Sequence, residues 1–256
     1  MNIKKHIPNL LTLGNLFCGT IATILAVQGN FVGAALFVIV GILFDFFDGF
    51  AARLLNVSGE LGKQLDSLAD MVTSGVVPGI IMFRLIEHSN IKFSDGGFNE
   101  GLVIPLAGID DYLSNGIYLL GLLLTLGACY RLAKFNIDTR QSDSFIGLPT
   151  PAMSLFVISL PLIQEFSDIE IAHNLISNNY FLIAVTLLLT YLMNAELPLF
   201  SLKFKEYSVK NNIVKYLFLV VSLLMIIFLK YISIPLIIIL YVLLSVVSNF
   251  QKKEVI

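Results

Sequence analysis

Four aspartates are spaced so that their carboxylates can share one site. Asp45 and Asp48 lie three residues apart within an apolar stretch, and Asp66 and Asp70 lie four residues apart further along the chain. On an α-helix, both spacings place the two side chains on one face. Four ionised carboxylates cannot gather without a counter-charge, and Arg53 alone would not balance them. The pattern therefore predicts a site for divalent metal.

The types of ligand narrow the metal and its chemistry. Carboxylate oxygens with no His or Cys among them suit hard cations such as Mg²⁺, Mn²⁺ or Ca²⁺. Two ions held by shared carboxylates form the clamp used for in-line phosphoryl displacement, because both the attacking and the leaving oxygen need stabilising. We expect Asp45, Asp48, Asp66 and Asp70 to bind two such ions. Gly49, directly after Asp48, removes a side chain where a ligand could approach the backbone.

The composition indicates which elements must position these aspartates. Of the 256 residues, 57% are hydrophobic and 13% are charged, and the mean hydropathy is +0.86. A soluble domain carries roughly 25% charged residues, so this chain has too little charge to cover a water-facing surface. The composition excludes a disordered protein, a nucleic-acid-binding basic module and an ordinary cytosolic enzyme. We expect an integral membrane protein that contacts membrane lipids and binds no nucleic acid.

Apolar stretches predict an all-α, polytopic bundle with about eight transmembrane helices. A helical span needs about 20 apolar residues. The candidate spans are 9–28, 33–54, 67–87, 115–134, 150–164, 179–198, 212–230 and 232–249. The fifth is short, and polar residues interrupt the third.

Lys and Arg fall mainly on one side of these eight spans. With both termini cytoplasmic, thirteen of the 16 basic residues lie on the cytoplasmic side. They are Lys4, Lys5, Arg53, Lys63, Arg131, Lys134, Arg140, Lys203, Lys205, Lys210, Lys215, Lys252 and Lys253. The other side keeps Arg84, Lys92 and Lys230, and its longer loops, 88–114 and 165–178, are acidic. Because cytoplasmic loops carry an excess of Lys and Arg, we expect both termini in the cytoplasm.

This topology brings the two aspartate pairs together. A short connection around 55–62 makes the second and third spans antiparallel neighbours, so the four carboxylates converge at one depth near the cytoplasmic surface. An ionised Asp near a helix centre costs about 2.5 kcal/mol or more, and such residues are usually functional. We therefore expect an active site that faces the cytoplasm.

The aspartates belong to a longer motif that resembles the CDP-alcohol phosphatidyltransferase family. The family pattern is D-x-x-D-G-x-x-A-R-x8-G-x-x-x-D-x-x-x-D, and every fixed position is present here. These positions are Asp45, Asp48, Gly49, Ala52, Arg53, Gly62, Asp66 and Asp70. The resemblance implies a six-helix catalytic core within residues 1–200, with two additional helices in 201–256.

The resemblance also implies a role for each of these residues. Asp45, Asp48 and Asp66 would hold the metals, and Asp70 would complete the second metal site and act as the general base. The expected contacts with CDP-diacylglycerol are Asn9, Thr12, Gly49, Ala52, Arg53, Ser58 and Gly62. As isolated polar residues within a span, Asn9 and Thr12 would otherwise serve as hydrogen-bonding groups between helices.

The flanking segments resemble the bacterial membrane-integral phosphatidylserine synthases within this family. The matching segments are 7–19, 65–70, 131–136 and 147–151. This resemblance implies transfer of the phosphatidyl group from CDP-diacylglycerol to the hydroxyl of L-serine in phospholipid biosynthesis, with CMP released. It also implies a homodimer in a bacterial inner membrane. Two positions depart from the subfamily pattern: Ser74 stands where Phe is expected, and Lys134 where Arg is commoner.

Serine carries a carboxylate that needs a cation. Arg131 and Lys134 follow the fourth span on the cytoplasmic side, and Asn136 comes two residues later. We expect these three residues to bind serine. The competing interpretation is that the basic residues only enforce the orientation of the chain in the membrane.

Two other functions stay open at this point. The same reaction could use another acceptor alcohol, namely glycerol phosphate, inositol phosphate or choline. A phosphorylated acceptor would need several cations, and the motif region supplies few. An ion or proton transporter would also use intramembrane acids, but here the four acids cluster at one membrane boundary and no inverted repeat is evident.

Overall fold

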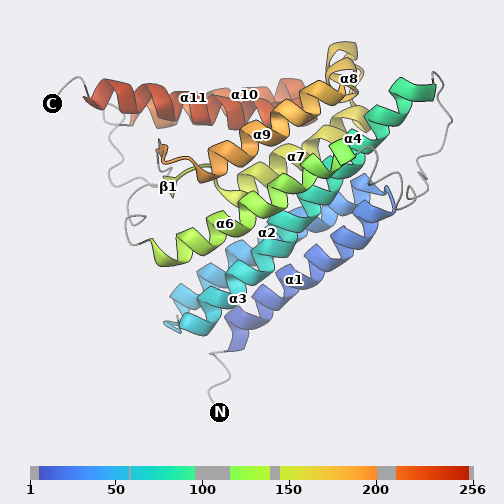
Figure 1. Ribbon diagram of the computed structural model, residues 1–256. Helices are drawn as coiled ribbons and strands as arrows, with labels where there is room; N and C mark the ends of the chain where they lie inside the picture. Colours follow the sequence, from blue (N-terminus) through green and yellow to red (C-terminus); the bar gives the residue numbers. More distant parts are fainter. Residues whose placement is uncertain (1–5, 58, 96–115, 139–144, 201–211, 254–256) are drawn as a thin grey trace.

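The computed structural model describes residues 6–57, 59–95, 116–138, 145–200 and 212–253, and these form an almost entirely helical bundle (Figure 1). The first two helices are α1 (His6–Val27) and α2 (Phe31–Leu54). Gly29 has a positive φ of 80° in the tight connection between them, and the Asn30 side chain accepts a hydrogen bond from the Gly33 backbone N–H at the start of α2. The two helices therefore pack as antiparallel neighbours.

The third helical segment forms the centre of the bundle. It consists of α3 (Glu60–Asp70), a π-helical stretch η2 (Met71–Val76) and α4 (Val77–Asp95), which follow one another without a break. The helix α4 contacts α1, α7 and α9, and its side chains Ile81, Met82 and Ile86 are fully buried. Asp66 and Asp70 lie on α3, the first part of this segment, which contacts α1 and α6.

The remaining helices cover the other side of α4 (Figure 1). They are a 3₁₀ turn η3 (Gly116–Leu122), α6 (Leu123–Ile137), α7 (Thr150–Phe166), α8 (Glu170–Ile176) and α9 (Asn179–Asn194). Two short strands, β1 (Phe145–Ile146) and β2 (Pro198–Leu199), pair antiparallel beside the ends of α6 and α9. The strand pair connects the start of α7 with the end of α9.

The last two helices form a hairpin. The helix α10 (Ile213–Leu229) is followed by a 3₁₀ turn η4 (Lys230–Ile232) and α11 (Ser233–Lys253). The rings of Phe218 and Tyr241 lie 5.8 Å apart between centroids, although 23 residues separate them. A straight helix would hold residues that far apart in sequence at roughly 34 Å, so α11 folds back along α10.

The all-α prediction is confirmed, and a helix lies at each of the eight predicted positions. In the described residues, five helices are long and apolar enough to cross a membrane, or six if the bent pair α8 and α9 counts as one span. Those figures treat Ile213–Ser248 as one stretch, and Thr150–Phe166 is shorter than a typical span. The count of eight spans and the position of the termini stay predictions.

Several boundaries differ from the predicted ones. The third helix begins at Glu60 and not at 67. The hydropathy did not indicate this start, because the eleven residues of α3 are amphipathic and polar on average. The predicted loop 165–178 contains α8, and the predicted loop 88–114 begins with the end of α4. The sixth helix ends at Asn194, four residues early, because Pro198 lies in β2 and cannot donate a helical hydrogen bond.

Candidate active site

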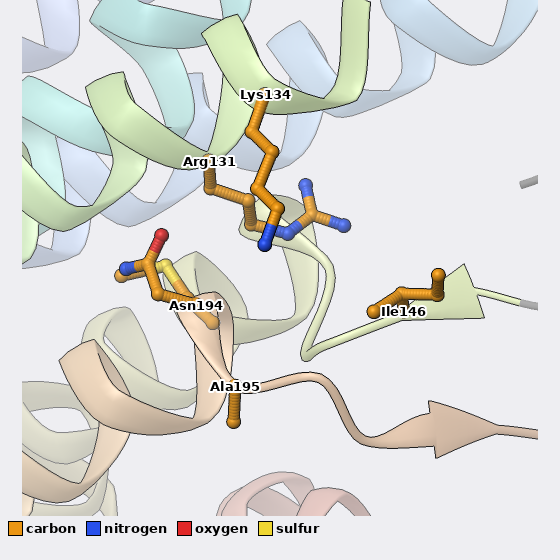
Figure 2. Close-up of a pocket in the computed structure, with 6 residues that line it drawn as sticks. Arg131, Lys134, Ile146, Asn194 and Ala195 are labelled. Carbon is orange, nitrogen blue, oxygen red and sulfur yellow. The ribbon is translucent and has the colours of Figure 1, made fainter. Parts of the chain in front are cut away.

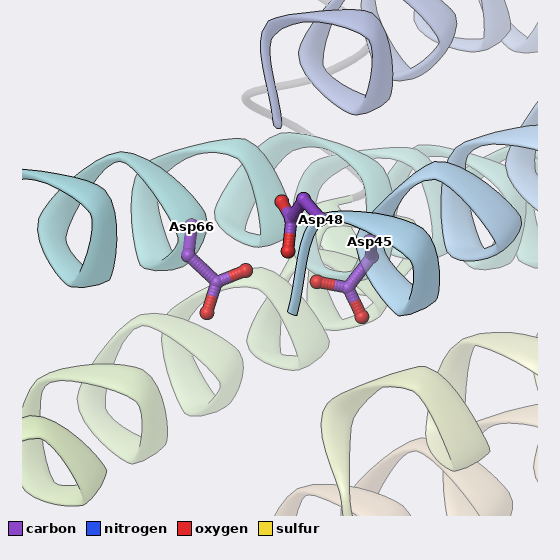
Figure 3. A group of neighbouring side chains, drawn as sticks. All are labelled: Asp45, Asp48 and Asp66. Atoms are coloured by element: carbon purple, nitrogen blue, oxygen red, sulfur yellow. The ribbon is translucent and has the colours of Figure 1, made fainter. Parts of the chain in front are cut away.

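Three of the four predicted metal ligands come together at one end of the bundle. Asp45 and Asp48 project from α2 and Asp66 from α3, and one carboxylate oxygen of each lies within 4.8 Å of the other two (Figure 3). Asp48 is buried, and the other two side chains are half-buried. The three-residue spacing places Asp45 and Asp48 on one face of α2. That face meets Asp66 because the short connection between α2 and α3 brings the two helices side by side.

The chemistry of this cluster fits a divalent cation. Asp66 Oδ1 is buried and has no hydrogen-bond partner among the described residues. A buried oxygen without a donor is costly, and three converging carboxylates repel one another unless a positive charge lies between them. Carboxylate oxygens are the ligands that Mg²⁺, Mn²⁺ and Ca²⁺ prefer. The residues present therefore suit a metal site formed by Asp45, Asp48 and Asp66.

A residue of helix α1 fixes the orientation of one of these three carboxylates, that of Asp48. The Thr12 hydroxyl donates a hydrogen bond of 2.5 Å to Asp48 Oδ2, and both side chains are buried. The sequence predicts that Thr12 contacts CDP-diacylglycerol, and the structure places its hydroxyl against a carboxylate of the aspartate cluster. Charge-assisted hydrogen bonds of this kind are among the stronger ones in proteins, so Thr12 holds Asp48 toward the cluster.

Asp70 lies one helical turn beyond Asp66 and has a partner of its own. The Asn15 side-chain N–H donates a hydrogen bond of 3.1 Å to Asp70 Oδ1. Asp70 is not part of the trio of oxygens within 4.8 Å. Asn15 is fully buried and was not among the predicted site residues. Its position three residues after Thr12 on α1, and hence on the same face, is the sequence signal that could have identified it.

Close packing of α1, α2 and η2 supports this arrangement. The Thr73 hydroxyl donates a hydrogen bond of 3.2 Å to the Asn15 carbonyl. The two glycines that face Thr73 are Gly19 of α1 and Gly41 of α2, where a Cβ would come too close to it. The π-helical stretch begins directly after Asp70, and such stretches are frequent at functional sites. The glycines thus allow η2 to approach the first two helices closely.

We expect Gly41→Ala to destabilise this packing. A Cβ at Gly41 would lie 2.8 Å from Thr73 Cγ2 and 2.9 Å from Asn15 Oδ1, and both neighbours are fully buried. Overpacking of this kind costs about 1–3 kcal/mol. The measurement is thermal unfolding of the purified protein in detergent, with Gly59→Ala as the control, because a Cβ there meets nothing within 4 Å. Equal unfolding temperatures for the two variants would refute the expectation.

The predicted CDP-diacylglycerol contacts surround the same end of α1, α2 and α3. A Cβ added at Gly49 would meet nothing within 4 Å, so the space beside it is open. Arg53 is exposed, and its Nε donates a hydrogen bond of 3.0 Å to the Gly49 carbonyl. A Cβ at Gly62 would lie 3.4 Å from Asn9 Oδ1, so the start of α3 lies next to the start of α1. Ala52 is half-buried on α2, and Ser58 lies outside the described residues.

The three predicted serine ligands on α6 have different surroundings. Arg131 is buried, with 8% of its surface exposed, and its Nη1 donates a hydrogen bond of 3.4 Å to the Thr150 hydroxyl. Lys134 Nζ forms an ion pair of 3.2 Å with Glu196. Arg131 and Lys134, three residues apart on α6, thus have different partners, Thr150 and Glu196.

Asn136 fastens α6 to α3. Its side-chain N–H donates a hydrogen bond of 2.9 Å to the Ser67 hydroxyl. Its backbone carbonyl accepts a hydrogen bond of 2.6 Å from Lys63 Nζ. Ser67 directly follows Asp66, so this contact connects the end of α6 with the residue next to the aspartate cluster. Asn136 is thus held by α3, whereas Arg131 and Lys134 share a pocket on the other face of the same helix end.

That pocket is small and lies between the ends of α6 and α9 (Figure 2). It is lined by Arg131, Lys134, Ile146, Met193, Asn194 and Ala195. Two cations of α6 therefore face the last residues of α9, which the sequence did not indicate as part of a site.

Comparison with known proteins finds similarity over most of the chain. The family model described as CDP-alcohol phosphatidyltransferase matches residues 5–193. A Bacillus subtilis CDP-diacylglycerol–serine O-phosphatidyltransferase is 33% identical over 156 residues, which is 61% of this chain and 75% of that protein. The Helicobacter pylori J99 protein of the same name is 34% identical over 160 residues, 62% of this chain and 58% of that protein.

An archaeal relative extends the similarity. The archaetidylserine synthase of Methanothermobacter thermautotrophicus is 28% identical over 192 residues, or 72% of each chain. The family match covers the α1, α2 and α3 residues that build the aspartate cluster, and it ends at Met193 beside the pocket. The chain belongs to the CDP-alcohol phosphatidyltransferase family.

Proposed function

We propose that the protein transfers the phosphatidyl group of CDP-diacylglycerol to the hydroxyl of L-serine, forming phosphatidylserine and CMP. The observation that carries this proposal is the group of three carboxylate oxygens from Asp45, Asp48 and Asp66 within 4.8 Å, with Asp70 one turn away. The names of the bacterial relatives and of the archaeal one support serine as the acceptor.

Asp45, Asp48 and Asp66 would hold divalent metal, Mg²⁺ or Mn²⁺, and Asp70 would complete a second ion's site. Bound cations would supply charge neutralisation for the pyrophosphate and for the departing CMP. Thr12 keeps the Asp48 carboxylate turned toward its neighbours through their hydrogen bond. The open space beside Gly49 and the exposed Arg53 would receive the CDP group, together with Asn9, Ala52, Ser58 and Gly62.

Asp70 is the proposed general base. Asn15 holds Oδ1, so that Oδ2 is left to accept the proton of the serine hydroxyl. The hydroxyl oxygen then attacks the phosphorus nearest the lipid, the bond from that phosphorus to the CMP oxygen breaks, and CMP leaves. A general base must lie within hydrogen-bond reach of its alcohol, and Asp70 lies one helical turn from Asp66 on the same helix.

Arg131 and Lys134 would bind the serine carboxylate, with Asn136 positioning α6 against α3. Arg131 is suited to this task because it is buried and lines one pocket together with Lys134. A phosphorylated acceptor would need several cations. Two of the described residues that line the pocket are cations, Arg131 and Lys134. This small number of cations favours serine over a phosphorylated acceptor.

We further propose an eight-span protein of a bacterial inner membrane, with both termini and the active site in the cytoplasm and a homodimeric assembly. The hairpins formed by α1 with α2 and by α10 with α11 support a chain that crosses the membrane back and forth. Residues 1–200 would form the catalytic core and 201–256 the additional helices.

An acceptor panel tests the reaction. Purified protein in detergent is incubated with CDP-diacylglycerol, Mn²⁺ or Mg²⁺, and one of serine, glycerol phosphate, inositol phosphate or choline, and CMP release is measured. We expect CMP with serine. Release with glycerol phosphate and none with serine would overturn the acceptor, and no release with any alcohol would favour the transporter alternative.

We expect Gly49→Ala to weaken CDP-diacylglycerol binding without harming the fold. The added methyl group meets no protein atom within 4 Å and improves helix propensity by up to about 1 kcal/mol. It would occupy space intended for the substrate, and we expect the KM for CDP-diacylglycerol to rise roughly tenfold. Steady-state kinetics and thermal unfolding check both halves; an unchanged KM would remove Gly49 from the binding site.

A further inference from the structure

The carboxamide of Asn194 has a fixed orientation at the end of α9. Its Nδ2 group donates hydrogen bonds to two backbone carbonyls, that of Gly127 on α6 at 3.2 Å and that of Thr190 on α9 at 3.0 Å. A flipped amide would place its oxygen against both acceptors. The oxygen Oδ1 must therefore point away from them, and Figure 2 shows it on the side of Arg131 and Lys134.

This oxygen is a buried hydrogen-bond acceptor. Asn194 Oδ1 has no hydrogen-bond partner in the part of the chain that the structure describes. Arg131 Nε, which lines the same pocket, is also buried and without an acceptor in those residues. Lys134 Nζ lies beside them and is paired with Glu196. The pocket thus offers two cations together with one neutral, pre-oriented oxygen.

We propose that Asn194 selects the acceptor by its amino group. In this assignment the α-ammonium of serine donates a hydrogen bond to Asn194 Oδ1, while its carboxylate binds Arg131 and Lys134. The inference rests on the proposed serine transfer, and it adds a specificity-determining residue that lies just outside the family match at residue 193. An ammonium satisfies an unpaired buried acceptor, whereas an acceptor alcohol with no amine leaves Asn194 Oδ1 unsatisfied.

A pair of acceptors isolates this contact. L-Serine and 3-hydroxypropionate share the hydroxyl and the carboxylate, and they differ in the ammonium group. Hydrogen bonds to charged groups contribute about 1.5–3 kcal/mol, which corresponds to a preference of at least about tenfold. We expect the wild-type protein to show this preference for serine in kcat/KM, measured as CMP release from CDP-diacylglycerol.

Two substitutions then test the residue. Asn194→Leu removes the acceptor, and we expect the preference for serine over 3-hydroxypropionate to fall at least about tenfold, toward one. Asn194→Asp keeps an oxygen acceptor on the pocket side but places its second oxygen against the Gly127 and Thr190 carbonyls. We therefore expect lower turnover with both acceptors, while the preference for serine persists. Thr190→Val is the control, because Thr190 also packs against Gly127 but does not line the pocket. It should change turnover with both acceptors by the same factor.

The outcomes separate the inference from the function on which it rests. No CMP release from the wild-type protein with serine overturns the proposed function. Turnover of serine and 3-hydroxypropionate with equal kcat/KM by the wild-type protein overturns the role of Asn194 while leaving serine transfer intact. Equal losses with both acceptors in Asn194→Leu would also overturn it, since they would indicate a purely structural contribution to the α6–α9 contact.

Discussion

Asp70→Asn is expected to abolish turnover while CDP-diacylglycerol still binds. The substitution keeps the size of the side chain and removes its capacity to take a proton, so the serine hydroxyl loses its base. Loss of a general base typically costs 10²–10⁴-fold in rate. The trio of Asp45, Asp48 and Asp66 is untouched, and metal-dependent binding of the substrate should persist. Steady-state CMP release and equilibrium binding of CDP-diacylglycerol measure the two halves.

A matched variant distinguishes this effect from a general loss of charge on α3. Glu60→Gln removes a carboxylate from the first turn of the same helix, where the side chain is exposed and outside the trio. We expect near-normal turnover from it. Turnover of Asp70→Asn at a rate close to that of Glu60→Gln would exclude Asp70 as the base.

Asp45→Asn is expected to weaken metal activation and substrate binding together. Asp45 contributes one of the three oxygens within 4.8 Å, so the neutral amide lowers the charge that attracts a cation. Because the metal would bind the pyrophosphate, a weaker metal site also raises the KM for CDP-diacylglycerol. We expect the Mn²⁺ concentration for half-maximal activity to rise by at least about tenfold, the effect of losing a hydrogen bond or contact to a charged group.

The contrast between the two aspartate variants is the informative result. Excess Mn²⁺ should restore part of the activity of Asp45→Asn and none of that of Asp70→Asn. Metal titrations of CMP release for both variants and the wild-type protein provide the comparison. An unchanged Mn²⁺ requirement in Asp45→Asn would exclude this residue as a ligand.

Much of the fold and the cluster could be predicted because both depend on local patterns. Apolar stretches of about 20 residues indicate helices wherever the solvent is lipid, and a helix lies at each of the eight positions. The three-residue and four-residue spacings put carboxylates on single faces of α2 and α3. The short connection between those helices then brings Asp45, Asp48 and Asp66 together.

The contacts that a pattern could not predict are those between distant segments. Asn15 reaches Asp70 across 55 residues of sequence, and Thr12 reaches Asp48 across 36. The helix α3 begins before the hydropathy rises, because its polar face carries the site while Leu61 and Leu68 are exposed on another. In the sequence, Asn194 is one polar residue near the end of a helix. Its role depends on the hydrogen bonds from its amide to the carbonyls of Gly127 and Thr190, which only the structure shows.

The stoichiometry of the products tests the central claim most directly. Labelled serine and CDP-diacylglycerol are incubated with the purified protein and Mn²⁺, and labelled lipid and CMP are quantified in the same sample. We predict one phosphatidylserine for each CMP, with both products lost on chelation of the metal. CMP without labelled lipid, or equal yields of both after complete metal removal, would contradict metal-dependent transfer to serine at the aspartate cluster.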